Sequence, residues 1–378
     1  MARKGHQRWV AIGIASTILF GTIPPGWGIP EVHAASESIP TFTSFKQIQK
    51  QLAQDLLERK TVMSFRYKGS TANLEGQLKQ SIEIALERDP YTKYIVDRYV
   101  FSWKGRASST KVTVKFVYRE TKAQTTYVNS KVKKIVQHII KKDMTDHEKI
   151  KVIHDYVIQN LKYDYGLQHF TAYEGLKIGE VVCQGYTLLT YRLLEEAGFT
   201  SKIVEGTAKG QLHAWNLVKL DGQWYHMDTT WDDPGDDTLF KGGVKYTYYL
   251  KTDQQLAVDH TWKRKKYPAA NSNYRDVLLG LVDTNTGKNG DRYEEISEDL
   301  GLHLYAEDAI VLSSADLVPK IDQQIKKGHK RALVRYAGSE DQLITDLASL
   351  YSLNIRKISY LMENLEDTDN WKVEIRWE

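Results

Sequence analysis

Apolar residues recur at helical spacing in two stretches in the middle of the chain. The first stretch, residues 150–161, predicts a helix with Asp146 as its N-cap. The second, residues 188–194, predicts a helix that ends at Gly198 and begins at or just before Cys183. These two helices are the strongest secondary-structure signals of the central region.

An alternating pattern follows the second helix and predicts a β-hairpin. Residues 212–220 form the first expected strand and residues 223–228 the second. Asp221-Gly222 between them is a typical two-residue hairpin loop. With this loop, Leu220 faces Gln223, and the register of the whole hairpin follows.

The register brings a histidine and an aspartate to one face of the hairpin. His213 and Trp215 share a face because side chains alternate along a strand. Counting outward from the loop, Trp215 faces Asp228, which makes Asp228 a diagonal neighbour of His213. Diagonal neighbours lie about 7–8 Å apart at Cα, within reach of a histidine–carboxylate hydrogen bond. The pattern therefore predicts a His213–Asp228 pair.

The two ends of the chain carry similar patterns. A shift of 269 positions superimposes them without a gap over about 35 residues, and each predicts helix, strand, helix, strand, strand. In each copy a Gly-Ser pair, with Ser70 or Ser339 as a possible N-cap, is expected to end the first strand. This similarity favours a duplicated unit of α/β type. The matching residues are Ile48, Leu52, Leu56, Arg66, Tyr67, Gly69, Leu74 and Leu78 in the first copy and Leu317, Ile321, Ile325, Arg335, Tyr336, Gly338, Leu343 and Leu347 in the second.

The N-terminal residues have the layout of a secretory signal peptide. A basic start precedes an apolar run over residues 9–23, and Val32-His33-Ala34 offers small residues for cleavage after Ala34. The apolar run is shorter than the ~20 residues of a spanning helix. We therefore expect a secreted protein, extracellular or at the cell surface, with no membrane span in the mature chain. The expected regions are a signal peptide (1–34), an N-terminal α/β unit (35–128), a core (129–268), a connecting segment (269–315) and a C-terminal α/β unit (316–378).

Charge and composition narrow the function classes. The hydrophobic share of 41% is typical of a globular protein. The formal net charge of +4 falls to +2 once the three cations and one anion of the leader are removed. A balance this small argues against nucleic acid or an anionic membrane as the partner. Two acidic stretches, residues 232–237 and 283–291, are expected to be a solvated loop and a polar turn, so no metal site is predicted.

The one cysteine of the chain stands where a nucleophile could form. A helix start favours a thiolate, because unpaired N–H groups point at it, and these groups could also hold an oxyanion. Gly185 is expected to keep the first turn of that helix open to a substrate. A cysteine, a histidine or an aspartate alone at such positions is usually structural. The combination of Cys183, His213 and Asp228 in this order indicates a catalytic triad.

His226 is the rival base on this hairpin. It lies two residues from Asp228 and therefore shares its face. The position of His213 beside Trp215 favours His213. Two histidines of the first helix, His147 and His154, are expected to be surface or packing residues.

The same residues carry a resemblance to a known family. Together the three motifs resemble the core motifs of the transglutaminase-like superfamily, and Tyr163-Asp164 is similar to an element that precedes them in bacterial members. The resemblance implies an α+β fold with a papain-like core, flanked here by the two small α/β units. The motifs are Val182-Cys183-Gln184-Gly185-Tyr186, His213-Ala214-Trp215-Asn216 and Trp224-Tyr225-His226-Met227-Asp228-Thr229-Thr230-Trp231.

The resemblance also implies roles for these residues. Cys183 would be the nucleophile, His213 the general base and acid, and Asp228 the residue that orients His213. Gln184 stands where the animal cross-linking enzymes have a tryptophan. The second oxyanion donor stays open, with candidates upstream of the cysteine. Candidates for oxyanion binding or substrate lining are Gln184, Tyr163 and Trp215, with Tyr165 and His169 as further upstream donors.

The implied activity is acyl transfer or hydrolysis on protein or peptide amides, through a thioester and without a cofactor. The expected partner is a protein or peptide substrate, which could be associated with a cell wall. The alternative is a secreted or wall-associated binding module on a papain-like scaffold that has lost its activity. The paired flanking units favour this alternative, and the intact triad disfavours it.

Overall fold

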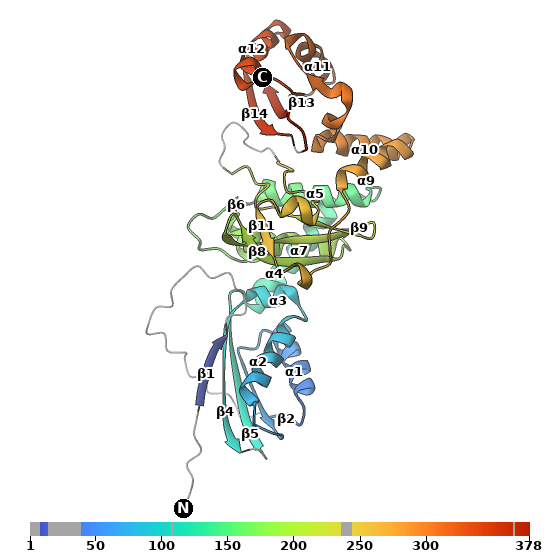
Figure 1. Ribbon diagram of the computed structural model, residues 1–378. Coiled ribbons are helices and arrows are strands. Elements are labelled where there is room, and N and C mark those ends of the chain that lie inside the picture. The colour runs from blue at the N-terminus through green and yellow to red at the C-terminus, as the bar shows by residue number, and fades with distance from the viewer. Residues whose placement is uncertain (1–7, 14–38, 107–108, 236–243, 366) are drawn as a thin grey trace, which may run out of the picture. The chain divides into compact units, whose positions relative to one another are not determined.

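The computed structural model shows an α+β fold, as the sequence predicts (Figure 1). The chain divides into two compact units, one of residues 1–235 and 247–271 and the other of residues 236–246 and 272–378. Within the described residues, no helix is both long enough and apolar enough to cross a membrane. The structure describes residues 8–13, 39–106, 109–235, 244–365 and 367–378.

The N-terminal region of the first unit is a five-stranded sheet packed against helices. Its elements are β1 (Arg8–Gly13), β2 (Thr41–Phe42), α1 (Phe45–Leu57), β3 (Val62–Tyr67), α2 (Leu74–Leu86), α3 (Pro90–Ile95), β4 (Val96–Arg106) and β5 (Ser109–Tyr118). The strand order is β1-β4-β5-β3-β2, and only β2 and β3 are parallel. Apolar side chains of α1, α2 and the three central strands form one core.

Strand β1 lies within the segment expected to be a signal peptide. In this structure it pairs antiparallel with β4. The rest of that segment, residues 1–7 and 14–34, lies outside the described residues. Removal of the leader stays a prediction.

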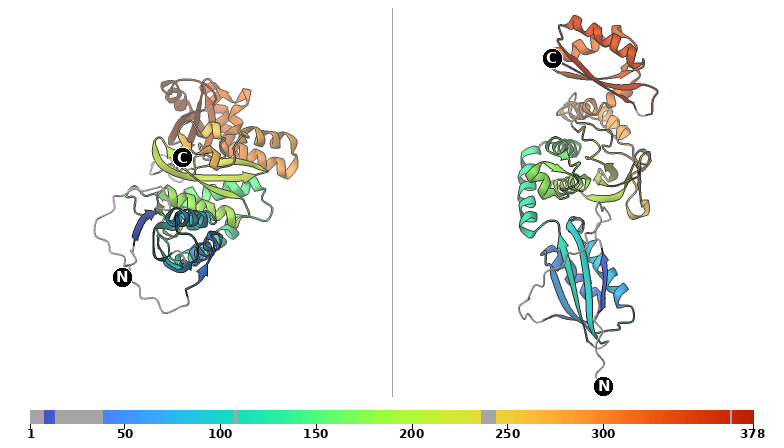
Figure 2. Two further views of the ribbon diagram at one scale, coloured as in Figure 1. Left: turned by 60° about the horizontal axis from the view of Figure 1, so that its bottom comes forward. Right: turned by 90° about the vertical axis from the view of Figure 1, so that its left-hand side faces the viewer.

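The central region of the first unit places helices against a four-stranded antiparallel sheet. Its elements are α4 (Lys122–Ile139), α5 (Asp146–Asn160), β6 (Lys162–Tyr163), α6 (Ala172–Ile178), β7 (Glu180–Val181), α7 (Cys183–Glu196), β8 (Ser201–Ala208), β9 (Gln211–Leu220), β10 (Gln223–Met227), α8 (Asp253–Leu256), β11 (His260–Trp262) and the 3₁₀ turn η2 (Arg264–Lys266). The sheet order is β10-β9-β8-β11. Helix α7 packs between α4, α5 and α6 on one side and β8 and β9 on the other, and Figure 2 shows these helices and the sheet as separate layers.

The predicted hairpin and the start of α7 are confirmed. Leu220 pairs with Gln223, and the loop residues Asp221 and Gly222 have φ values of 48° and 81°, which suit a two-residue turn of the primed type. Helix α7 begins at Cys183. These features fix the places of the cysteine and the histidine.

The predicted N-cap of α5 is wrong. Asp146 is the first residue of the helix, and the cap is Thr145. The Thr145 side chain accepts the N–H of Glu148, and the Glu148 side chain accepts the N–H of Thr145. This capping box satisfies two N–H donors at the helix start. Asp146 is already inside the helix and therefore cannot be the N-cap.

The second unit contains a helical segment followed by a four-stranded sheet. The unit contains α9 (Tyr274–Thr284), α10 (Gly287–Leu300), η3 (Leu302–Tyr305), η4 (Glu307–Ala309), β12 (Ile310–Val311), α11 (Ser314–Lys326), β13 (Arg331–Tyr336), α12 (Glu340–Ala348), η5 (Ser349–Leu353), β14 (Ile358–Asn364) and β15 (Trp371–Trp377). The expected polar turn at residues 283–291 is only partly right, because α9 ends and α10 begins within it.

The sheets at the two ends of the chain share one topology. The order β12-β13-β15-β14 repeats β2-β3-β5-β4, with the same parallel first pair and antiparallel others. In both, a tyrosine ring fills the space beside the matching glycine, since a Cβ at Gly69 or Gly338 would lie 2.4 or 2.8 Å from atoms of Tyr67 or Tyr336. Their origin by duplication stays a prediction.

One capping prediction in these regions holds and one does not. Ser339 caps α12 by accepting the N–H of Gln342. In the first sheet region the N-cap of α2 is Asn73, not Ser70. Helix α2 begins only at Leu74, so Ser70 remains in the preceding loop.

Candidate active site

Cys183 is the first residue of α7 and therefore lies at the N-terminal end of that helix. Its side chain is buried, with 5% of its surface exposed. The preceding residue, Val182, is the N-cap and makes no side-chain capping bond. The first N–H groups of a helix have no carbonyl partner within the helix, so they can serve an anion at this end.

Gly185 is needed for close packing, not for access of a substrate as the sequence suggested. A Cβ at this position would lie 2.4 Å from the Cβ of Val181. The glycine therefore lets α7 pack against β7 rather than opening the turn to a substrate. This contact anchors the helix start that carries Cys183.

His213 and Asp228 meet as the hairpin register predicts. The Nε2 of His213 lies 2.6 Å from Oδ2 of Asp228. The other carboxylate oxygen, Oδ1, accepts the N–H groups of Thr230 and Trp231 at 3.0 and 3.2 Å. Asp228 is fully buried, and its two oxygens are therefore held in fixed directions.

The electrostatics of this pair favour a protonated histidine beside an ionised aspartate. Burial alone would lower the pKa of His213, but the charge of Asp228, the hydrogen bond to it and a hydrogen bond with Cys183 raise it to about 10. Burial also opposes ionisation of Asp228, yet His213 and the hydrogen bond from His260 hold the pKa of Asp228 well below its usual range. Because Nε2 of His213 is engaged by Asp228, Nδ1 is the ring nitrogen left for an interaction with Cys183.

His260 is a functional candidate that the sequence pattern did not reveal. It lies on β11, and its Nε2 is 3.2 Å from the same Oδ2 of Asp228. Its Nδ1 is 2.5 Å from Oδ1 of Asp259, whose Oδ2 accepts the hydroxyl of Tyr248 at 2.6 Å. A second histidine–aspartate pair therefore contacts the same oxygen of Asp228 as His213 does.

The donor atoms of His213, Asp228 and His260 lie within 4.8 Å of one another, close enough for a metal ion. The Asp228 oxygen lies at hydrogen-bond distance from both imidazoles, 2.6 and 3.2 Å. The histidine–aspartate hydrogen bonds account for this cluster without an ion.

The rival base, His226, has partners of its own. Its Nδ1 accepts the indole N–H of Trp215 at 2.9 Å, and its Nε2 lies 2.9 Å from Oδ1 of Asp253. Burial lowers the pKa of His226 to about 4, against the opposing effect of Asp253. His226 is therefore a neutral packing residue and does not reach Asp228.

The remaining candidates divide between the site and the packing around it. Tyr163 lies near Cys183: burial and the charge of Cys183 raise the pKa of Tyr163 to about 12. Trp215 is buried beneath His213, with ring centroids 5.8 Å apart. The fully buried amide of Gln184 donates to the carbonyl of Tyr94 at 2.8 Å, so this side chain joins α7 to the N-terminal region. Among the upstream donors, Tyr165 is 78% exposed, and His169 contributes its carbonyl to the N–H of Val182.

The acidic run after the hairpin is not a fully solvated loop. Asp232 is completely buried, 3.0 Å from Nε2 of His154, and it also accepts the N–H of Tyr248. Asp233 accepts the hydroxyl of Tyr186 on α7. The run instead attaches this segment to α5 and α7, while residues 236–237 lie outside the described residues. His154 and His147 are both buried, which agrees with their expected packing role.

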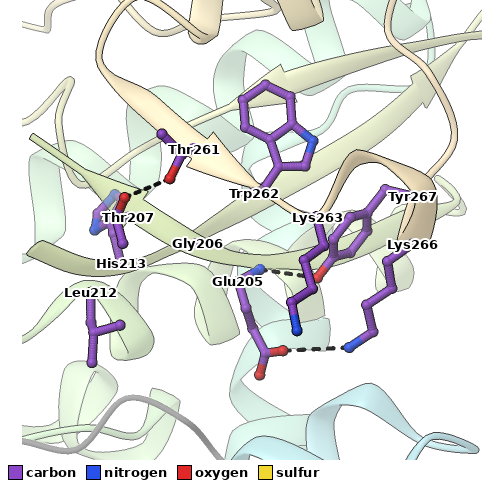
Figure 3. A pocket seen from close by; sticks show the side chains of 10 residues that line it. All are labelled: Glu205, Gly206, Thr207, Leu212, His213, Thr261, Trp262, Lys263, Lys266 and Tyr267. Carbon is purple, nitrogen blue, oxygen red and sulfur yellow. Dashed lines mark hydrogen bonds and ion pairs between the residues drawn. The ribbon is translucent and has the colours of Figure 1, made fainter. Parts of the chain in front are cut away.

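A groove of about 550 Å³ leads to His213 (Figure 3). Its lining residues come from the paired strands β8 and β11, from the start of β9 and from η2 with its flanking residues. Gly206 keeps the two strands close, because a Cβ there would lie 2.0 Å from the carbonyl oxygen of Thr261. The lining residues are Glu205, Gly206, Thr207, Leu212, His213, Thr261, Trp262, Lys263, Lys266 and Tyr267.

Comparisons with known proteins agree with the fold of this region. Residues 133–229 match the transglutaminase-like superfamily, which confirms the resemblance carried by the three motifs. The human kyphoscoliosis peptidase is 28% identical, in a match that covers 35% of this chain and 24% of the relative. The mouse kyphoscoliosis peptidase is also 28% identical, with coverage of 37% and 25%. The chain therefore spans about a quarter of the length of these relatives.

A solved structure of a TGase shares 14% sequence identity with a TM-score of 0.27 and covers 47% of this chain and 56% of that one.

Proposed function

We propose that this protein is a secreted cysteine enzyme that performs acyl transfer or hydrolysis on protein or peptide amides. The observation that carries the proposal is the buried His213–Asp228 hydrogen bond, together with Cys183 at the start of α7, which also helps to raise the pKa of His213. The cysteine stands at a helix start, so a neighbouring imidazolium and the helix N–H groups both favour its thiolate. The match to a superfamily that includes cysteine enzymes supports the same reaction class.

The proposed first half-reaction is attack on an amide. The sulfur of Cys183 forms a bond to the carbonyl carbon, and the carbonyl oxygen takes the negative charge. N–H groups at the start of α7 stabilise this oxyanion. When the oxyanion collapses, the carbon–nitrogen bond breaks and His213 gives its proton to the leaving ammonia or amine. A thioester between Cys183 and the acyl group remains.

The second half-reaction releases the acyl group. Neutral His213 now takes a proton from water or from a second amine, which attacks the thioester carbon. The carbon–sulfur bond breaks and Cys183 leaves as a thiolate, so the starting state is restored. Water gives hydrolysis and an amine gives transfer. Asp228 keeps His213 in the orientation that both steps need.

The test is turnover of glutamine-containing peptides by the chain, with and without a labelled amine. Mass spectrometry would separate deamidation, amine incorporation and peptide cleavage, and rapid quenching would trap the acyl group on Cys183. Cys183→Ala should lower turnover by on the order of 10⁶-fold with an unchanged circular dichroism spectrum. Turnover that survives in Cys183→Ala would remove this residue from the reaction.

A further inference from the structure

The groove beside His213 has a reactive end and a charged end. In Figure 3, His213 and Leu212 lie at one end, whereas Lys263, Lys266 and Glu205 converge at the other. Trp262 and Tyr267 add aromatic rings to the lining. A substrate that reaches His213 through this groove would therefore pass the charged end a few residues away from the reacting amide.

Four of the charges at this end balance one another. Lys266 lies 3.5 Å from both Glu205 and Glu87, and Lys93 lies 3.6 and 3.0 Å from the same two carboxylates. Two cations thus face two anions. The single carboxylate of the groove lining, Glu205, is already occupied by lysines of this network.

Three further cations form no ion pair with a described carboxylate; one of them, Lys263, lines the groove, and the other two follow it in sequence. Lys263, Arg264 and Lys265 are exposed and stand in one run next to Lys266. Arg264 lies over the ring of Trp262, 4.9 Å from its centroid. Among the described residues, Lys263 and Lys265 form no ion pair. The charged end of the groove therefore has an excess of positive charge, although the chain as a whole is almost balanced.

We propose that this groove binds a carboxylate-rich peptide segment of the substrate. The proposal rests on the proposed function and names the substrate class for it. Carboxylates a few residues from the reacting amide would face Lys263 in the lining and Lys265 two residues further on, and apolar side chains of the peptide would contact Trp262 and Tyr267. Exposed charge pairs contribute chiefly to encounter and specificity, so the preference should appear in kcat/KM and weaken with salt.

The experiment compares peptides that differ only in carboxylates placed along one side of a fixed glutamine. Acidic peptides should have a kcat/KM about tenfold above their amide-neutralised counterparts, with a dependence on the position of the carboxylates. The double variant Lys263→Glu/Lys265→Glu should remove this preference and leave the neutral peptides unchanged. Equal kcat/KM for acidic and neutral peptides in the unmodified protein would overturn the proposal.

The chain offers a matched control for the change in net charge. Lys46 and Lys79 are exposed lysines of α1 and α2 and do not line the groove. Lys46→Glu/Lys79→Glu carries the same charge change and should keep the preference for acidic peptides. If both double variants lose it equally, the effect comes from net charge and the groove proposal is wrong.

A binding assay separates this proposal from the proposed function. Labelled acidic peptide would be titrated into Cys183→Ala, with and without Lys263→Glu/Lys265→Glu, and followed by fluorescence anisotropy. Binding that the lysine substitutions abolish supports the groove even if no peptide is turned over. Absence of binding at low ionic strength, or binding that the substitutions leave unchanged, contradicts it.

Discussion

Two buried histidines of one hairpin lie beside aspartates and differ in charge. His213 is 2.6 Å from Asp228, and His226 is 2.9 Å from Asp253. The pKa of His213 is raised to about 10, whereas that of His226 is lowered to about 4. Proximity to a carboxylate therefore does not decide the charge of a buried histidine here.

The second ring nitrogen accounts for the difference. In His226 it accepts the indole N–H of Trp215. An indole can only donate, so this nitrogen must carry no proton and the ring is neutral. In His213 Asp228 engages Nε2, so the second nitrogen is left for Cys183, which can exchange a proton with it. The structural histidine and the candidate catalytic histidine therefore differ in the partner of the ring nitrogen that does not face the aspartate.

The largest expected effect separates these two histidines directly. His213→Ala should lower turnover by about 10³-fold or more while the protein stays folded, because the base and acid are lost. His226→Ala should instead lower the free energy of unfolding by about 2–4 kcal/mol, because Trp215 and Asp253 lose their buried partner. Kinetics and denaturant unfolding of both variants check this. Equal losses of turnover at equal stability would contradict the assigned roles.

Asp228→Asn tests the orientation of His213 without changing the shape of the site. We expect turnover to fall by about 10²–10⁴-fold, since an amide at this position cannot stabilise the imidazolium. The pKa of His213 should fall, which NMR of the imidazole would show. An unchanged pKa would mean that Asp228 is not the source of the shift.

A smaller effect is expected for His260, whose hydrogen bond to the reacting groups goes to Asp228. His260→Gln should lower kcat by roughly tenfold with little change in KM. This factor corresponds to the loss of about one hydrogen bond to a charged group. Its pH profile should also shift, because Asp228 then holds His213 less firmly. A loss of stability with an unchanged pH profile would give His260 a packing role only.

A last test of the His213–Asp228 pair is the pH dependence of stability. The pKa of His213 is about 10 in the folded protein and near 6.5 when unfolded, so the folded state binds more protons between these values. The contribution of His213 to the free energy of unfolding should therefore be fully present below pH 6.5 and should be lost as the pH rises towards 10. Thermal unfolding of the unmodified protein and His213→Gln would be compared across this range. The same decline in both would assign it to other groups.

Local signals predicted the central elements of the site. Asp221-Gly222 fixed the hairpin register, and this register brought His213 to Asp228. The start of α7 at Cys183 followed from the apolar spacing behind it. In each case the determining residues lie close together in the sequence.

The unpredicted features depend on contacts between distant segments. His260 reaches Asp228 only because the three-residue strand β11 pairs with β8, and so short a strand has no periodic signal. The acidic neighbours of Asp232 predict a solvated position for it. His154 on α5, 78 positions away in sequence, instead provides a buried partner. The groove combines residues of β8, β9, β11 and η2, and no single motif describes it.

The most direct test is the rate of Cys183 alkylation as a function of pH, measured in the unmodified protein and in His213→Ala. The account predicts fast alkylation well below ~8.5, the pKa of a free thiol, and loss of this reactivity in the variant. A rate that rises only near that value in both proteins would contradict an activated cysteine–histidine pair.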